Sequence, residues 1–234
     1  MMALEITNVT VRNDIRELVS GVSLRVEPGK VTAVLGANGA GKSELVLAIA
    51  GVLPLASGTV SVDGMPLSGL APDRIRRAGV AAVPEGHKVL TRLSVEDNLN
   101  AAGSTLPGAV ARQQLEKTYG LFPELRERRR QLAGTMSGGQ QQMLAIGHAL
   151  MSKPRYLLID EMSLGLAPVI VRRLAAAVSE LVKEGTGIVM VEQFTELALS
   201  LADDVLVMRT GRTRFSGPAA EIRQNPKILE EAYF

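Results

Sequence analysis

The sequence has no cysteine and no tryptophan, and aromatic residues make up only 3% of its 234 residues. Without cysteine, disulfide bonds and thiolate metal sites are excluded. So few aromatic rings leave no platform on which nucleic-acid bases would stack. The net charge is only +2, from 26 basic and 24 acidic residues, so no broad basic surface is expected either. We therefore expect no nucleic-acid partner.

Long apolar runs are also missing. A membrane-spanning helix needs about 18 or more apolar residues. The longest such run here, residues 45–56, is interrupted by Gly51 and Pro54. At the N-terminus no basic stretch precedes an apolar one, so we expect no signal peptide. These absences favour a cytoplasmic location.

Apolar sequence is nevertheless sufficient for one α/β domain, since hydrophobic residues make up 46% of the chain. Short apolar runs between turn residues predict strands, and longer segments predict helices. Strands are expected at residues 4–11, 22–26, 31–35, 59–62, 80–83, 156–160, 188–192, 205–209 and 213–216, and helices at 42–50, 94–102, 112–119, 125–132, 141–151 and 169–183. This alternation predicts a mainly parallel sheet with right-handed crossovers. The helix-rich stretch at about 85–152 predicts an inserted lobe.

A glycine-rich segment joins the expected strand at 31–35 to the expected helix at 42–50. It has the pattern G-x-x-x-x-G-K-[ST], in which successive backbone N–H groups surround phosphates. We assign nucleotide binding to Gly36, Ala37, Asn38, Gly39, Ala40, Gly41, Lys42 and Ser43. Lys42 would reach the β- and γ-phosphates, and the Ser43 hydroxyl would ligate Mg²⁺.

Two carboxylates, Asp160 and Glu161, end the apolar strand expected at 156–160. Ligands of open α/β sheets bind at the carboxyl ends of the strands. Asp160 is the candidate Mg²⁺ ligand, and Glu161 is the candidate general base for an attacking water. A strand that ends in Asp-Glu is also common in ordinary turns. The phosphate loop in the same chain favours the functional interpretation.

A second glycine pair precedes the helix expected at 141–151. Ser137 has the position of an N-cap, and Gln140 lies three residues further on, which is the spacing of a capping box. The free N–H groups of such a helix attract phosphate, and Gly138 and Gly139 would let it come close. Taken alone, the segment also fits an ordinary capped helix.

With these three elements in order, the chain resembles ATP-binding cassette (ABC) ATPases over almost its full length. The resemblance implies an α/β fold with a P-loop NTPase core, an N-terminal antiparallel β subdomain and an inserted α-helical subdomain. We expect a single nucleotide-binding domain over residues 1–234, with its core at about 1–84 and 153–234 and its lobe at about 85–152. The implied cofactors are ATP and Mg²⁺. The family's signature loop, here Ser137, Gly138, Gly139 and Gln140, binds the ATP held by the opposite subunit.

Further segments narrow the resemblance to one group of importers. Residues 83–86, 121–123, 134–139, 163–168 and 191–193 look like those of an ATPase subunit of bacterial branched-chain amino-acid importers. The wider group includes importers of urea and short amides. The resemblance implies a second ABC ATPase subunit, the same or different, two membrane permease subunits and, indirectly, an extracytoplasmic solute-binding protein. It places the chain at the inner face of the cell membrane.

Two departures from the wider family concern the chemistry. Glu85 stands where many cassettes have a Gln that senses Mg²⁺, so we include it with Ser43 and Asp160 in the metal site. Gln193 stands where a His that senses the γ-phosphate is common, and we expect it to act beside Glu161 in catalysis. Both agree with the importer group.

Other departures concern the residue beside the adenine base, the loop after the second motif and the two histidines. Asn13 takes the place of the Tyr that stacks on adenine and departs from the importer group as well. Gly165 replaces an Asp in the loop after the second motif and, like Glu85 and Gln193, agrees with the importer group. His87 and His148 lie in different segments, so no metal site is expected from them. We expect His148 to be a packing or surface residue. For His87 we expect exposure to solvent rather than the alternative, a hydrogen bond beside the loop that follows the strand at 80–83.

Two alternatives to an importer subunit remain open. A soluble cassette acting on DNA or the ribosome usually carries two cassettes or long added arms, and this chain has neither. A regulatory cassette that does not hydrolyse ATP would account for the altered motif positions. The intact Lys42, Ser43, Asp160 and Glu161 argue against the regulatory cassette.

Overall fold

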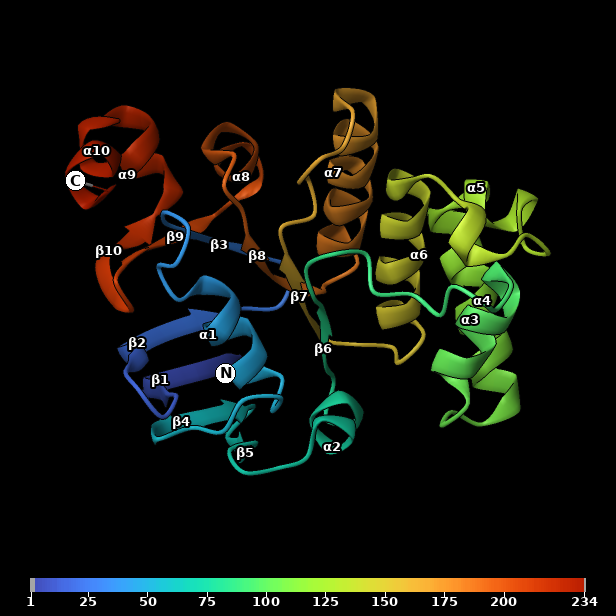
Figure 1. The fold of residues 1–234 in the computed structure, drawn as a ribbon, viewed down its shortest axis with the longest axis horizontal. Coiled ribbons are helices and arrows are strands. Elements are labelled where there is room, and N and C mark those ends of the chain that lie inside the picture. The colour runs from blue at the N-terminus through green and yellow to red at the C-terminus, as the bar shows by residue number, and fades with distance from the viewer. Residues whose placement is uncertain (1–2, 234) are drawn as a thin grey trace.

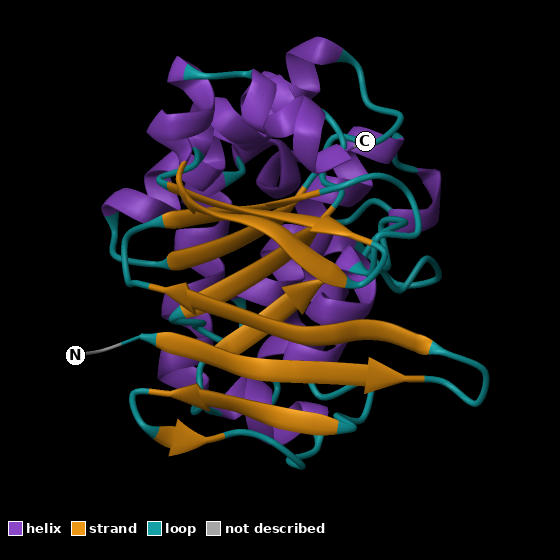
Figure 2. Cartoon of the chain, turned by 90° about the vertical axis from the view of Figure 1, so that its left-hand side faces the viewer, coloured by secondary structure: helices purple, strands orange, loops and turns teal. Residues whose placement is uncertain are grey.

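The computed structural model describes residues 3–233 and contains two β-sheets (Figures 1 and 2). The smaller sheet is antiparallel and has the order β2-β1-β4-β5. Its strands are β1 (Leu4–Arg12), β2 (Glu17–Val26), β4 (Ser57–Val62) and β5 (Met65–Pro66). The turn at Asp63 and Gly64 joins β4 to β5, a pair of residues typical of tight hairpin turns.

The larger sheet has the order β10-β9-β3-β8-β7-β6 and is parallel except for its edge strand β10. Its strands are β3 (Val31–Leu35), β6 (Val80–Val83), β7 (Tyr156–Asp160), β8 (Gly187–Val191), β9 (Asp204–Arg209) and β10 (Arg212–Pro218). β3, β6 and β7 begin and end at the predicted residues. The predicted α/β class with a mainly parallel sheet is therefore confirmed.

Helices surround this sheet. They are α1 (Lys42–Ile49), α2 (Pro72–Arg77), α3 (Val95–Gly103), α4 (Gly108–Leu121), α5 (Pro123–Glu127), α6 (Gly138–Leu150), α7 (Pro168–Lys183), α8 (Thr195–Leu201), α9 (Ala219–Gln224) and α10 (Lys227–Tyr233), with a 3₁₀ turn η1 (Ala133–Thr135). Helices α3 to α6 lie between β6 and β7 in the chain and gather at one end of the molecule, away from α1 (Figure 1). No helix within residues 3–233 combines the length and apolar character needed to cross a bilayer.

The parallel sheet separates two hydrophobic clusters. Residues alternate between its faces: Ala33 and Leu35 pack with the helices of the far side, whereas Val34 packs with α1 and the antiparallel sheet. Strands β3, β7 and β8 are buried on both faces, which explains their continuous apolar sequences. The carboxyl ends of β3, β7 and β8 therefore lie side by side on a rigid support.

One predicted helix is wrong in its extent. Residues 125–132 were expected to be helical, but α5 ends at Glu127. The backbone beyond it pairs with another segment instead: Val95 N–H donates to the Gln131 carbonyl, and Ala133 N–H donates to the Leu93 carbonyl. Tertiary hydrogen bonds thus override the local helical pattern.

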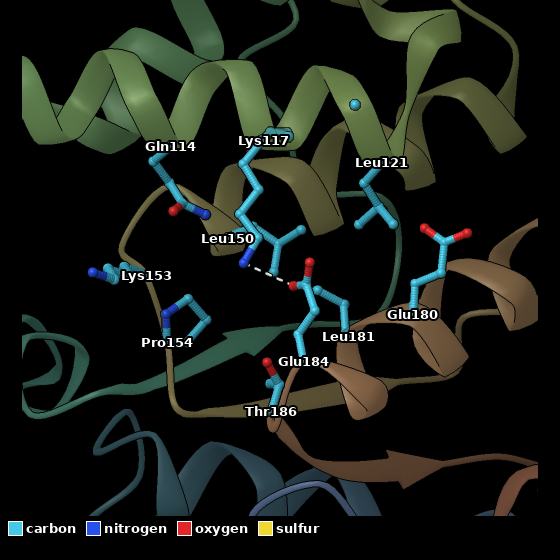
Figure 3. Close-up of a pocket in the computed structure, with 12 residues that line it drawn as sticks. Gln114, Lys117, Leu121, Leu150, Lys153, Pro154, Glu180, Leu181, Glu184 and Thr186 are labelled. Carbon is cyan, nitrogen blue, oxygen red and sulfur yellow. Dashed lines mark ion pairs between the residues drawn. The ribbon is translucent and has the colours of Figure 1, made fainter.

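The helices at 108–150 contact α7 through a partly open junction. A cavity of about 310 Å³ lies between α4, the end of α6 and the end of α7 (Figure 3). Lys117 of α4 and Glu184, which follows α7, form an ion pair of 2.7 Å across this cavity. Exposed ion pairs contribute little free energy. This ion pair therefore adds little to the stability of the junction.

Candidate active site

The phosphate loop presents an exposed arc on a buried base. Ala37, Asn38 and Gly39 are exposed, whereas Gly41 and Lys42 at the start of α1 are buried. Gly41 has φ +97°, and a Cβ atom there would collide with the Leu18 carbonyl. Only glycine fits this position. The close approach of β2 fixes the base of the loop, and the exposed arc is left for a ligand.

The Lys42 ammonium lies inside the loop. It donates hydrogen bonds to the carbonyls of Gly36 (2.9 Å) and Ala37 (3.1 Å). Burial lowers its pKa, and the nearby carboxylates of Glu161 and Asp160 oppose this shift. A buried cation at the base of an exposed glycine-rich loop favours the binding of an anion.

Asp160 lies at the end of β7 and is only 3% exposed. Burial raises the pKa of its carboxyl to about 6; the nearby Ser43 hydroxyl opposes this shift, and Glu161 and Glu85 add to it. Its Oδ1 atom is buried and has no hydrogen-bond partner. This unpaired oxygen beside Ser43 fits a Mg²⁺ ion. Mg²⁺ in nucleotide sites takes one or two carboxylates together with phosphate oxygens and water. It therefore needs no larger cluster, and residues 3–233 contain no group of three His, Cys, Asp or Glu that would hold a metal.

Glu161 and Gln193 meet at the adjoining strand ends. The Gln193 Nε2 atom donates to Glu161 Oε1 at 2.7 Å. Glu161 has φ +50°, a conformation uncommon for a residue other than glycine. Its N–H donates to the Val191 carbonyl at 2.9 Å, which fixes this turn. The two predicted catalytic side chains, 32 positions apart in the sequence, are thus in direct contact.

A further buried carboxylate, Glu192, was not among the predicted site residues. It is 1% exposed and accepts hydrogen bonds from the Ser163 hydroxyl (2.6 Å) and the Ser163 N–H (3.2 Å). The sequence contains one weak indication that Glu192 is buried, since it follows a wholly apolar strand. Its partner lies 29 positions away and is not readable from the sequence.

Ser137 caps α6 as predicted. Its N–H donates to Gln140 Oε1 (3.0 Å) and its hydroxyl accepts from the Gln140 N–H (3.4 Å), so the capping box is complete. Gly138 is exposed, but Gly139 is buried. A Cβ atom at Gly139 would lie 2.6 Å from Ile170 of α7. Gly139 thus serves helix packing, and Gly138 is the glycine that leaves room for a ligand.

The expectation that His87 is exposed is wrong. His87 is half-buried, and its Nδ1 atom lies 2.6 Å from Gln142 Oε1 in α6. Its Nε2 atom lies 3.5 Å from where a Cβ of Gly138 would be. The segment that follows Glu85 therefore touches the signature loop, although 55 positions separate His87 from Gln142.

His148 is half-buried near the end of α6, in agreement with a packing role. Burial and, to a lesser degree, Arg76 lower its pKa from 6.5 to about 4. The imidazole takes up its proton near pH 6.5 in the unfolded chain but only near pH 4 in the folded protein. The free energy of unfolding is therefore at its full value above pH 6.5 and decreases as the pH falls towards 4. We predict that His148→Gln loses about 3 kcal/mol less stability than the wild type over this range. Urea unfolding at pH 7, 5.5 and 4.5 measures this, and parallel pH profiles would refute it.

Asn13 lies in the exposed turn between β1 and β2. Its side-chain oxygen accepts from the N–H groups of Ile15 (3.0 Å) and Arg16 (2.8 Å). It is therefore engaged in holding the turn.

The sequence model of the family described as ABC transporter matches residues 19–163, more than half of the chain. The chain belongs to the ABC transporter family. As an ABC ATPase it binds and hydrolyses ATP. The matched residues include the phosphate loop, the signature loop and the carboxylates that end β7.

Relatives of this ABC ATPase include importer subunits. The chain is 45% identical over 209 residues to the high-affinity branched-chain amino acid transport ATP-binding protein BraG of Pseudomonas aeruginosa, covering 89% of this chain and 90% of that protein. It is 33% identical to the probable branched-chain amino acid transport ATP-binding protein LivF of Archaeoglobus fulgidus, covering 88% of each. These relatives are components of ABC transporter systems, which implies membrane permease partners.

A solved structure supports the same fold. An ATP-binding subunit of an ABC transporter superposes with a TM-score of 0.85 at 26% identity, covering 98% of this chain and 97% of that one. The ADP conformation of an ATP-binding cassette superposes with a TM-score of 0.84, also at 26% identity, covering 98% of both chains.

Proposed function

We propose that this ABC ATPase energises the import of branched-chain and other hydrophobic amino acids. The observation that carries the proposal is its 45% identity to BraG over nearly the full length of both chains. Import of urea or short amides, or a soluble role outside transport, are the alternatives. The proposed location is cytoplasmic, on the inner face of the cell membrane.

In the proposed site, residues 36–43 hold the phosphates of ATP. Ser43 and Asp160, with Glu85 nearby, would hold Mg²⁺, which neutralises phosphate charge when bound. Glu161 is the proposed base. Because its Oε1 already accepts from Gln193, Oε2 is left to take the proton of the attacking water. The Gln193 amide also orients that carboxylate, as a neutral donor that carries no charge of its own.

A second cassette is the proposed partner across the ATP. The signature loop 137–140 lies at the lobe and the phosphate loop lies at β3, so one chain supplies two separate half-sites (Figure 1). Apolar side chains are exposed beside the catalytic residues: Leu164 (41%), Val169 (61%) and Phe194 (57%). They flank a groove of about 720 Å³. Exposed apolar groups around a site favour an interface there.

The permeases are proposed to contact the segment that follows β6. Lys88 is exposed there, and Leu90 and Leu93 expose 48% and 37% of their surface. A short helix of a permease would bind such a surface through apolar anchors. This segment begins the proposed lobe at about 85–152, and His87 within it contacts α6. Docking of a permease there would therefore affect the position of the signature loop at the start of α6.

Transport by reconstituted vesicles tests the proposed function. The chain is assembled with its native partners, and ATP-driven uptake of leucine, urea and acetamide is compared in one preparation. We expect uptake of leucine above the other two, and none with the Lys42→Ala complex. Preferred uptake of urea or acetamide would contradict the proposed substrate. A chain that forms no complex with permeases would contradict a transport role.

A further inference from the structure

Within residues 3–233, four side chains that carry charge at neutral pH are buried: Lys42, Asp160, Glu161 and Glu192. The first three belong to the phosphate loop and to the end of β7. Glu192 is the most buried of the four, at 1% exposure, and the proposed chemistry gives it no task. A buried carboxylate costs free energy unless its hydrogen bonds are satisfied. Its place in the fold therefore calls for a functional explanation.

The side chain of Glu192 bonds to Ser163 in another loop, and its N–H donates to the Val34 carbonyl at 3.4 Å. Both of its carboxylate oxygens accept hydrogen bonds from Ser163, at 2.6 Å and 3.2 Å. No salt bridge involves Glu192 in the described part of the chain. Burial raises the pKa of its carboxyl to about 6, and the bonds from Ser163 oppose that shift. This contact ties the loop after β7 to the loop after β8.

Gln193, the next residue, is exposed, so packing does not hold its side chain. Its amide nevertheless donates to Glu161 Oε1 at 2.7 Å. The Glu161 N–H in turn bonds to the Val191 carbonyl. Residues 161–163 and 191–193 are therefore joined at three places, and the contact between Glu192 and Ser163 is the one that joins two buried side chains. Loss of that contact removes the side-chain anchor next to Gln193.

We propose that Glu192 is a positioning residue, which holds Gln193 against Glu161 by anchoring its backbone to Ser163. The inference rests on the proposed catalytic roles of Glu161 and Gln193. Ser163 lies in the loop between β7 and α7, which continues through Gly165 and lines the same groove as Gln193. The anchor therefore also links the proposed surface for a second cassette to the residue that orients the base.

A double-mutant cycle of Glu192 and Gln193 tests this inference. ATPase kinetics are measured on the assembled complex for Glu192→Ala, Gln193→Ala and the double variant. We expect Glu192→Ala to lower kcat about 10–100-fold, as a displaced catalytic group does. KM for ATP should stay within about twofold, because the phosphate loop is intact. In the Gln193→Ala background, Glu192→Ala should lower kcat by less than about twofold, since there is no side chain left to position.

Two further variants separate positioning from loss of fold. Glu192→Gln has the same shape and keeps an acceptor for the Ser163 N–H, so it should recover most of the kcat lost in Glu192→Ala. Ser163→Ala should lower kcat in the same direction as Glu192→Ala. Thr118→Val changes a buried polar side chain of α4 and is the control for general destabilisation.

Equal kcat losses from Glu192→Ala in both Gln193 backgrounds would overturn the inference, as would a rise in KM with kcat unchanged. The double-mutant cycle and the test of Glu161 as the general base can be told apart by their results. Normal turnover by Glu161→Gln would remove Glu161 as the base, whereas the coupling between positions 192 and 193 would still decide whether Glu192 acts through Gln193.

Discussion

Glu161→Gln is expected to slow ATP hydrolysis by about 10²–10⁴-fold while leaving ATP binding intact, which is the range for loss of a general base. The amide has nearly the shape of the carboxylate and still accepts from Gln193 at the position of Oε1. It cannot take a proton from water. ATP should therefore persist in the site, and the variant should accumulate as an ATP-bound dimer.

Single-turnover kinetics and nucleotide binding measure this effect. Glu221→Gln, an exposed change in α9 far from the site, is the control and should behave as the wild type. Near-normal turnover by Glu161→Gln would exclude Glu161 as the base. The neighbouring Asp160 would then be the remaining carboxylate at this strand end.

Lys42→Ala is expected to weaken ATP binding by about 10–100-fold, because one charge-assisted contact contributes about 1.5–3 kcal/mol. The change removes the cation from a buried position, where it also bonds to the Gly36 and Ala37 carbonyls. The loop thus loses both its charge and an internal support. Lys42→Ala is thus expected to impair ATP binding, whereas Glu161→Gln is expected to impair hydrolysis.

Isothermal titration with a non-hydrolysable ATP analogue checks this prediction. Lys183→Ala, at the exposed end of α7, removes the same charge away from the site and serves as the control. An affinity unchanged by Lys42→Ala and by the control alike would show that the loop backbone alone holds the phosphates.

Much of the fold was predictable because local sequence and burial agree. Strands β3, β6 and β7 are continuous apolar runs between turn residues, so their ends were predicted to the residue. β2 was predicted to start at residue 22 but begins at Glu17, because its first half alternates with exposed residues and carries no continuous apolar signal. The short helices α2 and α8 bury only Ile75 and Ala198, respectively, and were missed for lack of a periodic pattern.

The site was predictable where neighbouring residues carry the chemistry, and not where distant ones meet. The capping box of α6 was predicted because Ser137 and Gln140 lie three residues apart. The bond from His87 to Gln142 joins two elements whose relative position only the packing decides. The same holds for the contact between Glu192 and Ser163.

The most direct test of the central claim, that one chain supplies two half-sites of a shared ATPase, is the rate of ATP hydrolysis per subunit against protein concentration. The rate is measured for the isolated chain and for the complex with a second cassette and the permeases. We predict a largely monomeric protein without nucleotide, a slow rate that rises with concentration, and much faster turnover in the complex. Gln193 lacks the charge of a histidine and Gly165 lacks a carboxylate, which favours this dependence on partners. A rate that is already high, independent of concentration and unchanged by partners would contradict the account.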